Sequence, residues 1–115
     1  MAKENVIVDK SFEFSLEIIE LYKLLKNNNE FVLSKQVLRS GTSIGANVEE
    51  AIGGFSKRAF TAKMGIALKE ARETRYCLRL LDRSQIVKCE LTGSMKKAEE
   101  LVSILTAIVK TSQGN

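Results

Sequence analysis

The segment from Gln36 to Ala51 (QVLRSGTSIGANVEEA) constrains the fold more than any other part of this chain. Its apolar and small positions recur every three or four residues, at Val37, Gly41, Ile44, Val48 and Ala51. This spacing puts them on one face of an α-helix, although serine and glycine disfavour helix interiors. The segment therefore predicts a helix whose small-residue face lets a neighbouring helix approach closely.

Three other segments have the same helical periodicity, and the chain contains no proline to interrupt them. We predict helices over residues 9–26, 31–52, 57–83 and 90–111, joined by short connections. Four amphipathic helices joined in this way predict an all-α fold. The predicted architecture is an antiparallel up-down-up-down four-helix bundle in a single domain over residues 1–115.

Local signals indicate where these helices begin and end. Asp9 or Ser11 can accept backbone N–H bonds at the start of the first helix, and Ser56 can do so for the third. Asn27–Asn29 is expected to end the first helix, because asparagine tolerates the left-handed conformation common at helix ends. Gly53–Gly54 is expected to end the second helix for the same reason.

The predicted third helix has two apolar faces. One consists of Phe60, Met64, Ala67, Ala71 and Leu78. The other lies on a different side and consists of Ile66, Cys77 and Leu80. A helix with two apolar faces usually has two partners, so the second face is a candidate contact with another subunit.

Composition narrows the class of protein. Of the 115 residues, 44% are hydrophobic and 28% charged, which is typical of a folded globular domain. No apolar run approaches the roughly 18 residues that a membrane span needs, and the first residues lack the apolar core of a signal peptide. We therefore expect a cytoplasmic protein.

The sequence offers little for catalysis. It has no histidine, and Cys77 and Cys89 alone cannot supply the roughly four ligands of a zinc site. We expect reduced thiols, no metal and no cofactor. Without histidine, a general base near neutral pH would need a shifted glutamate or lysine, and Gly53–Lys57 lacks the spacing of a P-loop. We predict that the protein is not an enzyme.

Positive charge is concentrated on the predicted third helix. Residues 57–83 include eight basic and three acidic side chains, a net charge of +5 against +4 for the whole chain. Within an arc of roughly 80° lie four arginines with a lysine at the edge. We call this set the arginine stripe: Lys69, Arg72, Arg75, Arg79 and Arg83.

Two interpretations of the arginine stripe are open. It could bind the phosphate backbone of a nucleic acid with little reading of sequence. It could also be a solvated face whose arginines pair with acids on other helices or subunits, such as Glu13, Glu17, Glu99 or Glu100. Only Tyr76 supplies an aromatic ring near the stripe, whereas single-strand binders usually interleave several.

A second polar set consists of Arg39, Ser43, Asn47 and Glu50 on the second helix, with Glu70 and Glu73 on the third. Its first four members share one helix face. The set could contact a small ligand or a nucleic acid. We favour a structural network in which Arg39 or Asn47 bonds Glu70 or Glu73, because buried polar groups must be satisfied.

Two stretches resemble the signature sequences of the 23S rRNA intervening-sequence proteins, a bacterial family. They are Ser43–Glu50 (SIGANVEE), which follows Gln36 and Arg39–Ser40, and Ile66–Thr74 (IALKEARET). The likeness covers about residues 9–110. At one point the chain departs from the family, since many members carry a proline where this chain has Asn27-Asn28-Asn29-Glu30.

The resemblance implies a four-helix bundle that assembles as a homopentamer and an association with nucleic acid. Some members are encoded within insertions in 23S ribosomal RNA genes. A related protein, the accessory factor of diversity-generating retroelements, is a basic pentamer that works beside a reverse transcriptase. For most members no biochemical activity is established.

Two functions from different classes follow. The first is a non-catalytic, basic homo-oligomeric bundle that associates with RNA or DNA through the arginine stripe. The alternative is an oligomeric scaffold or assembly protein that has a protein partner and no affinity for nucleic acid. Neither function involves a membrane.

Overall fold

The computed structural model describes residues 2–114 and places most of them in four helices. These are α1 (Ala2–Asn27), α2 (Leu33–Ile52), α3 (Lys57–Ser84) and α4 (Thr92–Gln113). The described residues contain no strand, so the predicted all-α class is confirmed. Within the same residues, none of the helices is both long and apolar enough to cross a membrane.

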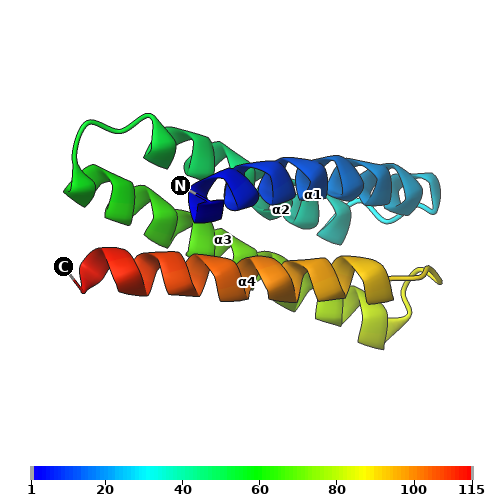
Figure 1. Cartoon of the computed structure of the whole chain (residues 1–115). Helices are drawn as coiled ribbons and strands as arrows, with labels where there is room; N and C mark the ends of the chain where they lie inside the picture. The colour runs from blue at the N-terminus through cyan, green and yellow to red at the C-terminus, as the bar shows by residue number, and fades with distance from the viewer. Residues whose placement is uncertain (1, 115) are drawn as a thin grey trace.

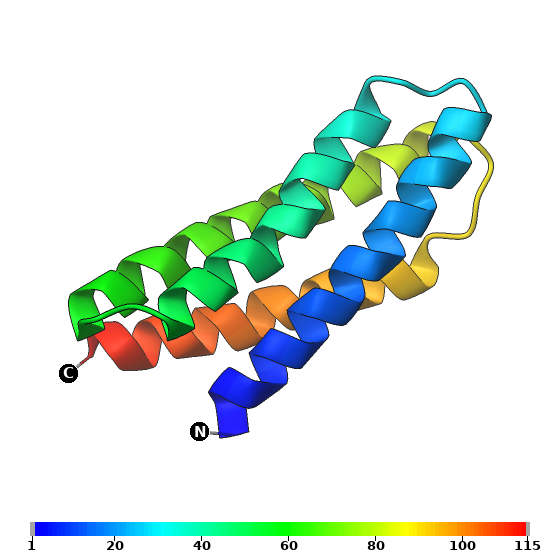
Figure 2. The same cartoon turned by 90° about the horizontal axis from the view of Figure 1, so that it is seen from above.

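The helices form a bundle 46 Å long and 20 Å across. Each helix runs back along the one before it, so the chain passes up, down, up and down the bundle (Figure 1 and Figure 2). Contacts join α1 to α2, α2 to α3, α3 to α4 and α4 back to α1, and the α1–α4 contact is the least extensive. Each helix therefore has one face in the core, a neighbour on either flank and one face outward.

The apolar stripes predicted from the sequence form the core. α1 contributes Phe14, Ile18, Leu21 and Leu25, each 8% exposed or less. The largest buried side chains of the other three helices are Val37, Ile44, Met64, Leu78, Leu81, Leu101 and Leu105. Burial of a side chain of this size stabilises the fold by roughly 1.5–3 kcal/mol. The core thus decides which face of each helix is left for solvent.

The start of α1 was predicted wrongly. The prediction placed it near Asp9 or Ser11, whereas the helix begins at Ala2. Ile7 is fully buried seven residues before Phe14, so it continues the core stripe by two more turns. The Ser11 hydroxyl donates to a carbonyl oxygen within the helix instead of capping it. Burial of Ile7 outweighs the local capping preference of Asp9 and Ser11.

The turn into α2 is capped by a residue whose role the sequence analysis missed. Asn29 has a left-handed φ of 65°, in agreement with the prediction for the end of α1. The carboxylate of Glu30 then accepts hydrogen bonds at 2.6–3.3 Å from the backbone N–H groups of Val32, Leu33 and Ser34. It satisfies free donors at the positive end of the helix dipole. As a result, α2 begins at residue 33 instead of residue 31.

The small-residue face of α2 packs against α1. A Cβ atom added to Gly41 would lie 2.9 Å from two carbon atoms of the Ile18 side chain, closer than real contacts allow. One added to Gly45 would lie 3.4 Å from the carbonyl oxygen of Ser11. The predicted close approach of a neighbouring helix is confirmed, and that helix is α1.

The connection between α2 and α3 follows the prediction in part. α2 ends at Ile52, but Gly53 has a φ of −81° and makes no use of the left-handed conformation. The Ser56 hydroxyl accepts the N–H of Ala59 at 3.0 Å, which confirms it as the N-cap of α3. At the other end of α3, Gln85 takes up the left-handed conformation with a φ of 53°.

α4 begins and ends two residues later than the predicted range of 90–111. Glu90 lies before the helix, where its Oε1 accepts the N–H of Thr92 at 2.8 Å. Hydrogen bonds from the side chain and the backbone of Thr92 lower the pKa of Glu90, because they favour the charged carboxylate. Glu90 therefore caps α4 from outside, as Glu30 caps α2.

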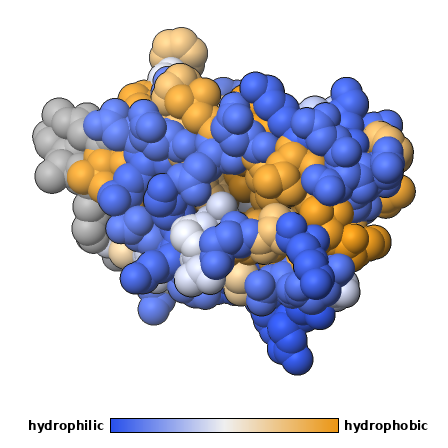
Figure 3. Space-filling model, turned by 90° about the vertical axis from the view of Figure 1, so that its right-hand side faces the viewer, coloured by the Kyte–Doolittle hydropathy of each residue, from blue (hydrophilic) through white to orange (hydrophobic). Residues whose placement is uncertain are grey.

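The α1–α2 and α3–α4 connections lie at the same end of the bundle (Figure 1). They expose three large apolar side chains: Phe31 at 50%, Val32 at 68% and Ile86 at 59%. Figure 3 looks onto this end and shows hydrophobic surface beside hydrophilic surface. We call these three residues the apolar end, a surface that the sequence analysis did not identify.

Candidate nucleic-acid interface

α3 turns its charged side outward because its apolar side is in the core. The buried side consists of Met64, Ala67, Ala71, Leu78 and Leu81. At about 100° per residue, the opposite side consists of Lys69, Arg72, Tyr76, Arg79 and Arg83, all of them exposed. Their spacing of 3, 4, 3 and 4 residues makes one row along the outside of the bundle.

Arg75 stands apart from this row. Its Nη1 atom lies 2.7 Å from Oε1 of Glu99 on α4, and its side chain is 32% exposed. This residue of the predicted arginine stripe thus forms an ion pair between neighbouring helices, on the flank of α3 that faces α4. Glu99 is one of the acids that were expected to pair with the arginine stripe if the stripe is a solvated, ion-paired face.

The other four cations of the stripe have no such partner. They make no ion pair and no side-chain hydrogen bond with any residue from 2 to 114. We call this set the outer basic face: Lys69, Arg72, Arg79 and Arg83. From its first to its last residue it extends about 21 Å along α3. Positive charges gathered without counter-charges attract anions to this side of the bundle.

Tyr76 lies in the middle of the outer basic face and is 59% exposed. The other tyrosine, Tyr22 on α1, is half-buried, and the Lys26 ammonium lies over its ring at 5.6 Å from the centroid. Among the described residues, no cation covers the ring of Tyr76 in this way. The Tyr76 ring is therefore accessible to a ligand held by the flanking cations.

The fold divides the predicted second apolar face of α3. Cys77 is 4% exposed and faces α2, with its thiol 3.9 Å from the carbonyl oxygen of Leu33. Ile66 and Leu80 are 38% and 39% exposed. Cys77 thus belongs to the bundle, and only Ile66 and Leu80 remain available to a second subunit.

Arg39 joins α2 to α3. Its guanidinium lies 3.1 Å from Oε1 of Glu70 and also pairs with Glu73. The hydrogen bond to Glu73 is the main cause that raises the pKa of Arg39, and Glu70 adds to it. The Glu70 side chain is only 11% exposed, so its charge needs a partner. These are the contacts that the structural interpretation of the polar set predicts.

The rest of the polar set is bonded elsewhere. The Ser43 hydroxyl donates to the carbonyl oxygen of Arg39 at 2.6 Å, and the Asn47 amide donates to that of Ser43 at 2.9 Å. Glu50 pairs with Lys63 of α3 at 2.6 Å. Ser43 and Asn47 therefore bond within α2, and Glu50 links α2 to α3 about three turns away from Arg39. The six residues do not form one cluster.

A buried hydroxyl pair that was not predicted from the sequence joins α2 to α3. Oγ1 of Thr74 lies 2.8 Å from Oγ of Ser40 and 2.8 Å from the carbonyl oxygen of Glu70. Ser40 and Thr74 are both fully buried. A signal was available, because Thr74 continues the stripe of Ala67 and Ala71, and a polar residue in a buried stripe needs a partner.

The two cysteines are free thiols. Burial, with help from the charges of Glu30 and Glu73, raises the pKa of Cys77 to about 11. Burial is also the main cause that raises the pKa of Cys89. Both thiols are protonated near neutral pH, and the thiol form is a poor nucleophile. Within residues 2–114, no three acidic or thiol side chains are grouped as a metal site.

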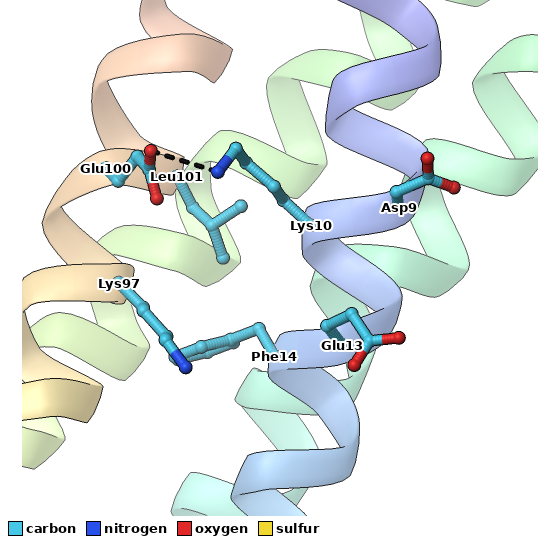
Figure 4. A pocket seen from close by; sticks show the side chains of 7 residues that line it. All are labelled: Asp9, Lys10, Glu13, Phe14, Lys97, Glu100 and Leu101. Carbon is cyan, nitrogen blue, oxygen red and sulfur yellow. Dashed lines mark ion pairs between the residues drawn. The ribbon is translucent and has the colours of Figure 1, made fainter.

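A groove of about 220 Å³ lies between α1 and α4 (Figure 4). Phe14 and Leu101 line it and are themselves buried in the core. Lys10 and Glu100 form an ion pair of 3.1 Å across it, and Lys97 pairs with a carboxylate of α1. The cations of this groove are thus neutralised, unlike those of the outer basic face.

The four-helix bundle defines the class of protein, and comparison with known proteins then gives the family. Residues 3–107 match the family described as 23S rRNA-intervening sequence protein, so the chain belongs to this family. This confirms the resemblance found in the sequence.

The chain is also similar to a protein of unknown function from the S23 ribosomal protein family of Bacteroides thetaiotaomicron VPI-5482, seen in a crystal structure. The two are 47% identical, the match covers 94% of this chain and 98% of that one, and the TM-score is 0.88. No curated protein matches the chain. Neither comparison assigns an activity.

Proposed function

We propose that this protein is a non-catalytic, homo-oligomeric bundle of the cytoplasm that binds RNA or DNA by the phosphate backbone. The outer basic face is the observation that supports this function most directly. Its four cations are exposed and have no acidic partner among the described residues. Arginine presents a planar fork of donors that suits phosphate oxygens. Contacts to phosphate alone bind with little preference for sequence.

Self-association would strengthen this binding. Each copy added to a ring brings another outer basic face, and the potential at the surface rises with the number of charges. The family resemblance implies five copies. Apolar surface that a second copy could cover is present on α1, where Phe12 and Leu16 are 58% and 46% exposed, and on α3 at Ile66 and Leu80.

The test is fluorescence anisotropy of labelled RNA and duplex DNA at two salt concentrations. We expect affinity to fall with salt, with a log–log slope of about 0.7 to 0.9 for each phosphate contacted. The double variant Arg72→Glu/Arg79→Glu removes two cations of the outer basic face without breaking an ion pair seen in the fold. It changes the net charge from +4 to 0 and should abolish binding.

The matched control is Lys35→Glu/Lys96→Glu. It makes the same change in net charge with two exposed lysines of α2 and α4 that form no ion pair with a described residue. We expect this control to bind within a few-fold of the unaltered protein. Unchanged binding by the α3 variant, or equal losses in both variants, would refute the outer basic face as the site. Circular dichroism and light scattering check that fold and oligomeric mass are preserved.

The alternative function, an oligomeric scaffold with a protein partner, is favoured by the apolar end. It predicts a stable oligomer that binds no nucleic acid at physiological salt. Leu80→Asp tests the subunit contact, because an exposed position tolerates aspartate without unfolding of the bundle. Monomers of this folded variant would place Leu80 between subunits. An intact oligomer without affinity for RNA or DNA would support the scaffold.

A further inference from the structure

We infer that the outer basic face binds single-stranded nucleic acid, with one base stacked on the ring of Tyr76. This inference rests on the proposed function and names the form of its ligand. It assigns a separate task to the aromatic residue: the cations hold the backbone, and the ring recognises a base that is not already stacked.

The placement of Tyr76 within the row supports this assignment. Along the helix axis, Arg72 comes about 6 Å before Tyr76 and Arg79 about 4.5 Å after it. Lys69 and Arg83 occupy the two ends of the row. A strand that follows α3 would therefore meet cations on both sides of an exposed ring. Cations interleaved with a stacking ring are typical of proteins that bind single strands.

Accessibility distinguishes Tyr76 from Tyr22, the other tyrosine. The Tyr22 ring is half-buried and lies beneath Lys26, so a base could not reach it freely. Tyr76 makes no side-chain hydrogen bond to a described residue and has more than half of its surface exposed. Its ring can thus accept a base without breaking a side-chain hydrogen bond or a cation–ring contact found among the described residues.

Stacking on Tyr76 also determines which nucleic acids are bound best. In a duplex, each base is already stacked between its neighbours, whereas the bases of single strands, loops and ends can be splayed onto an aromatic side chain. The cations serve both forms, because both carry phosphates. Tyr76 should therefore strengthen binding to single strands and leave binding to duplexes unchanged. Bases of both RNA and DNA can stack on the Tyr76 ring.

The experiment measures the affinity of the full-length protein for three labelled probes: a single-stranded RNA, a single-stranded DNA of the same sequence, and the corresponding DNA duplex. Tyr76→Ala should weaken binding to the single strands by about 5- to 100-fold, the range expected for loss of one stacked base. Tyr76→Phe keeps the ring and should bind within about twofold of the unaltered protein. Neither variant should change duplex binding.

Two controls make the result specific. Phe31→Ala removes a ring of similar exposure, at 50%, that lies outside the outer basic face, and it should leave every affinity unchanged. Because the chain has two tyrosines and no tryptophan, the Tyr22→Phe variant reports Tyr76 alone by its fluorescence. Single strands should quench this signal, and the duplex should not.

The outcomes separate this inference from the proposed function. Unchanged single-strand affinity in Tyr76→Ala, with loss of binding in Arg72→Glu/Arg79→Glu, would overturn stacking and leave phosphate binding intact. An equal loss on single strands and duplex in Tyr76→Ala would also overturn it. Absence of binding to all three probes by the unaltered protein would overturn both.

Discussion

Two helix–helix interfaces of the bundle, which we call the α2–α3 seam and the α1–α4 seam, are held together in different ways. At the α2–α3 seam, the buried hydroxyls of Ser40 and Thr74 lie 2.8 Å apart, and Arg39 bonds the largely buried Glu70 at the rim. At the α1–α4 seam, an open groove of about 220 Å³ is crossed by the exposed pair of Lys10 and Glu100. The α2–α3 seam is closed around buried polar groups, and the α1–α4 seam is bridged by a direct, exposed ion pair.

The difference shows which interface of the bundle should tolerate little substitution and which should tolerate more. A buried hydrogen-bonded pair tolerates little change, because either partner left alone is costly in the interior. An ion pair in water contributes little and is screened by salt. We therefore expect α2 and α3 to behave as a fixed unit and the α1–α4 seam to accept substitution.

Ser40→Leu should have the largest effect on stability. The larger side chain would overpack the closed seam and remove one of the two hydrogen-bond partners of the Thr74 hydroxyl, which would keep only the carbonyl oxygen of Glu70. We expect a loss of about 3 kcal/mol in the free energy of unfolding, measured by urea denaturation. The matched control, Ser103→Leu on the exposed surface of α4, should change it by less than about 0.5 kcal/mol. Similar losses in both variants would show that the α2–α3 seam is not closed.

Thr74→Val should destabilise the protein by about 1–2 kcal/mol. It keeps the shape of the side chain but removes the Thr74 hydroxyl, so the buried Ser40 hydroxyl loses its hydrogen-bond partner. A double-mutant cycle with Ser40→Ala isolates the pair and should give a coupling of about 1 kcal/mol. The coupling should not depend on salt, since neither group is charged. Additive effects of the two substitutions would contradict the bond.

A cycle between Lys10→Ala and Glu100→Ala should give a coupling below about 1 kcal/mol. Their side chains are 43% and 49% exposed, so water screens the pair. Raising the salt concentration should reduce the coupling further. A coupling as large as that of Ser40 and Thr74, or one that salt does not change, would mean that the two seams are held alike.

Cys77, at the α2–α3 seam, should resist alkylation in the folded protein. Its pKa of about 11 keeps the thiol protonated at pH 8, and reactivity should rise only as the pH approaches that value. Half-buried Cys89 should react faster. Mass spectrometry of the alkylated protein checks both sites, with the urea-unfolded chain as control. Rapid labelling of Cys77 at pH 8 would show that the seam opens.

Much of the fold could be predicted because apolar periodicity is a local property of the sequence. Phe14, Ile18, Leu21 and Leu25 appear in order along the chain and form one face of α1. The starts of three helices were harder. Ile7 extends α1 beyond its expected cap, and Glu30 and Glu90 cap α2 and α4 from outside. Long acidic side chains can adopt many conformations, so their sequence positions did not reveal these bonds.

The residues of the candidate site could be predicted from the sequence, but which of them form ion pairs could not. Arg72, Arg75 and Arg79 are chemically alike and share one broad stripe. Nothing local distinguishes Arg75, which reaches Glu99 only because α4 packs along that flank of α3. In the polar set, the contact of Arg39 with Glu70 was expected, whereas the pairing of Glu50 with Lys63 was not.

The sequence by itself determined four helices, the apolar face of each and the concentration of positive charge on α3. These follow from spacing along the chain, which sets the direction of every side chain around its own helix axis. The tertiary structure alone decided which cations are neutralised and which form the outer basic face with Tyr76 among them. Ion pairs depend on which helices become neighbours, and that choice is made by the packing of the whole core.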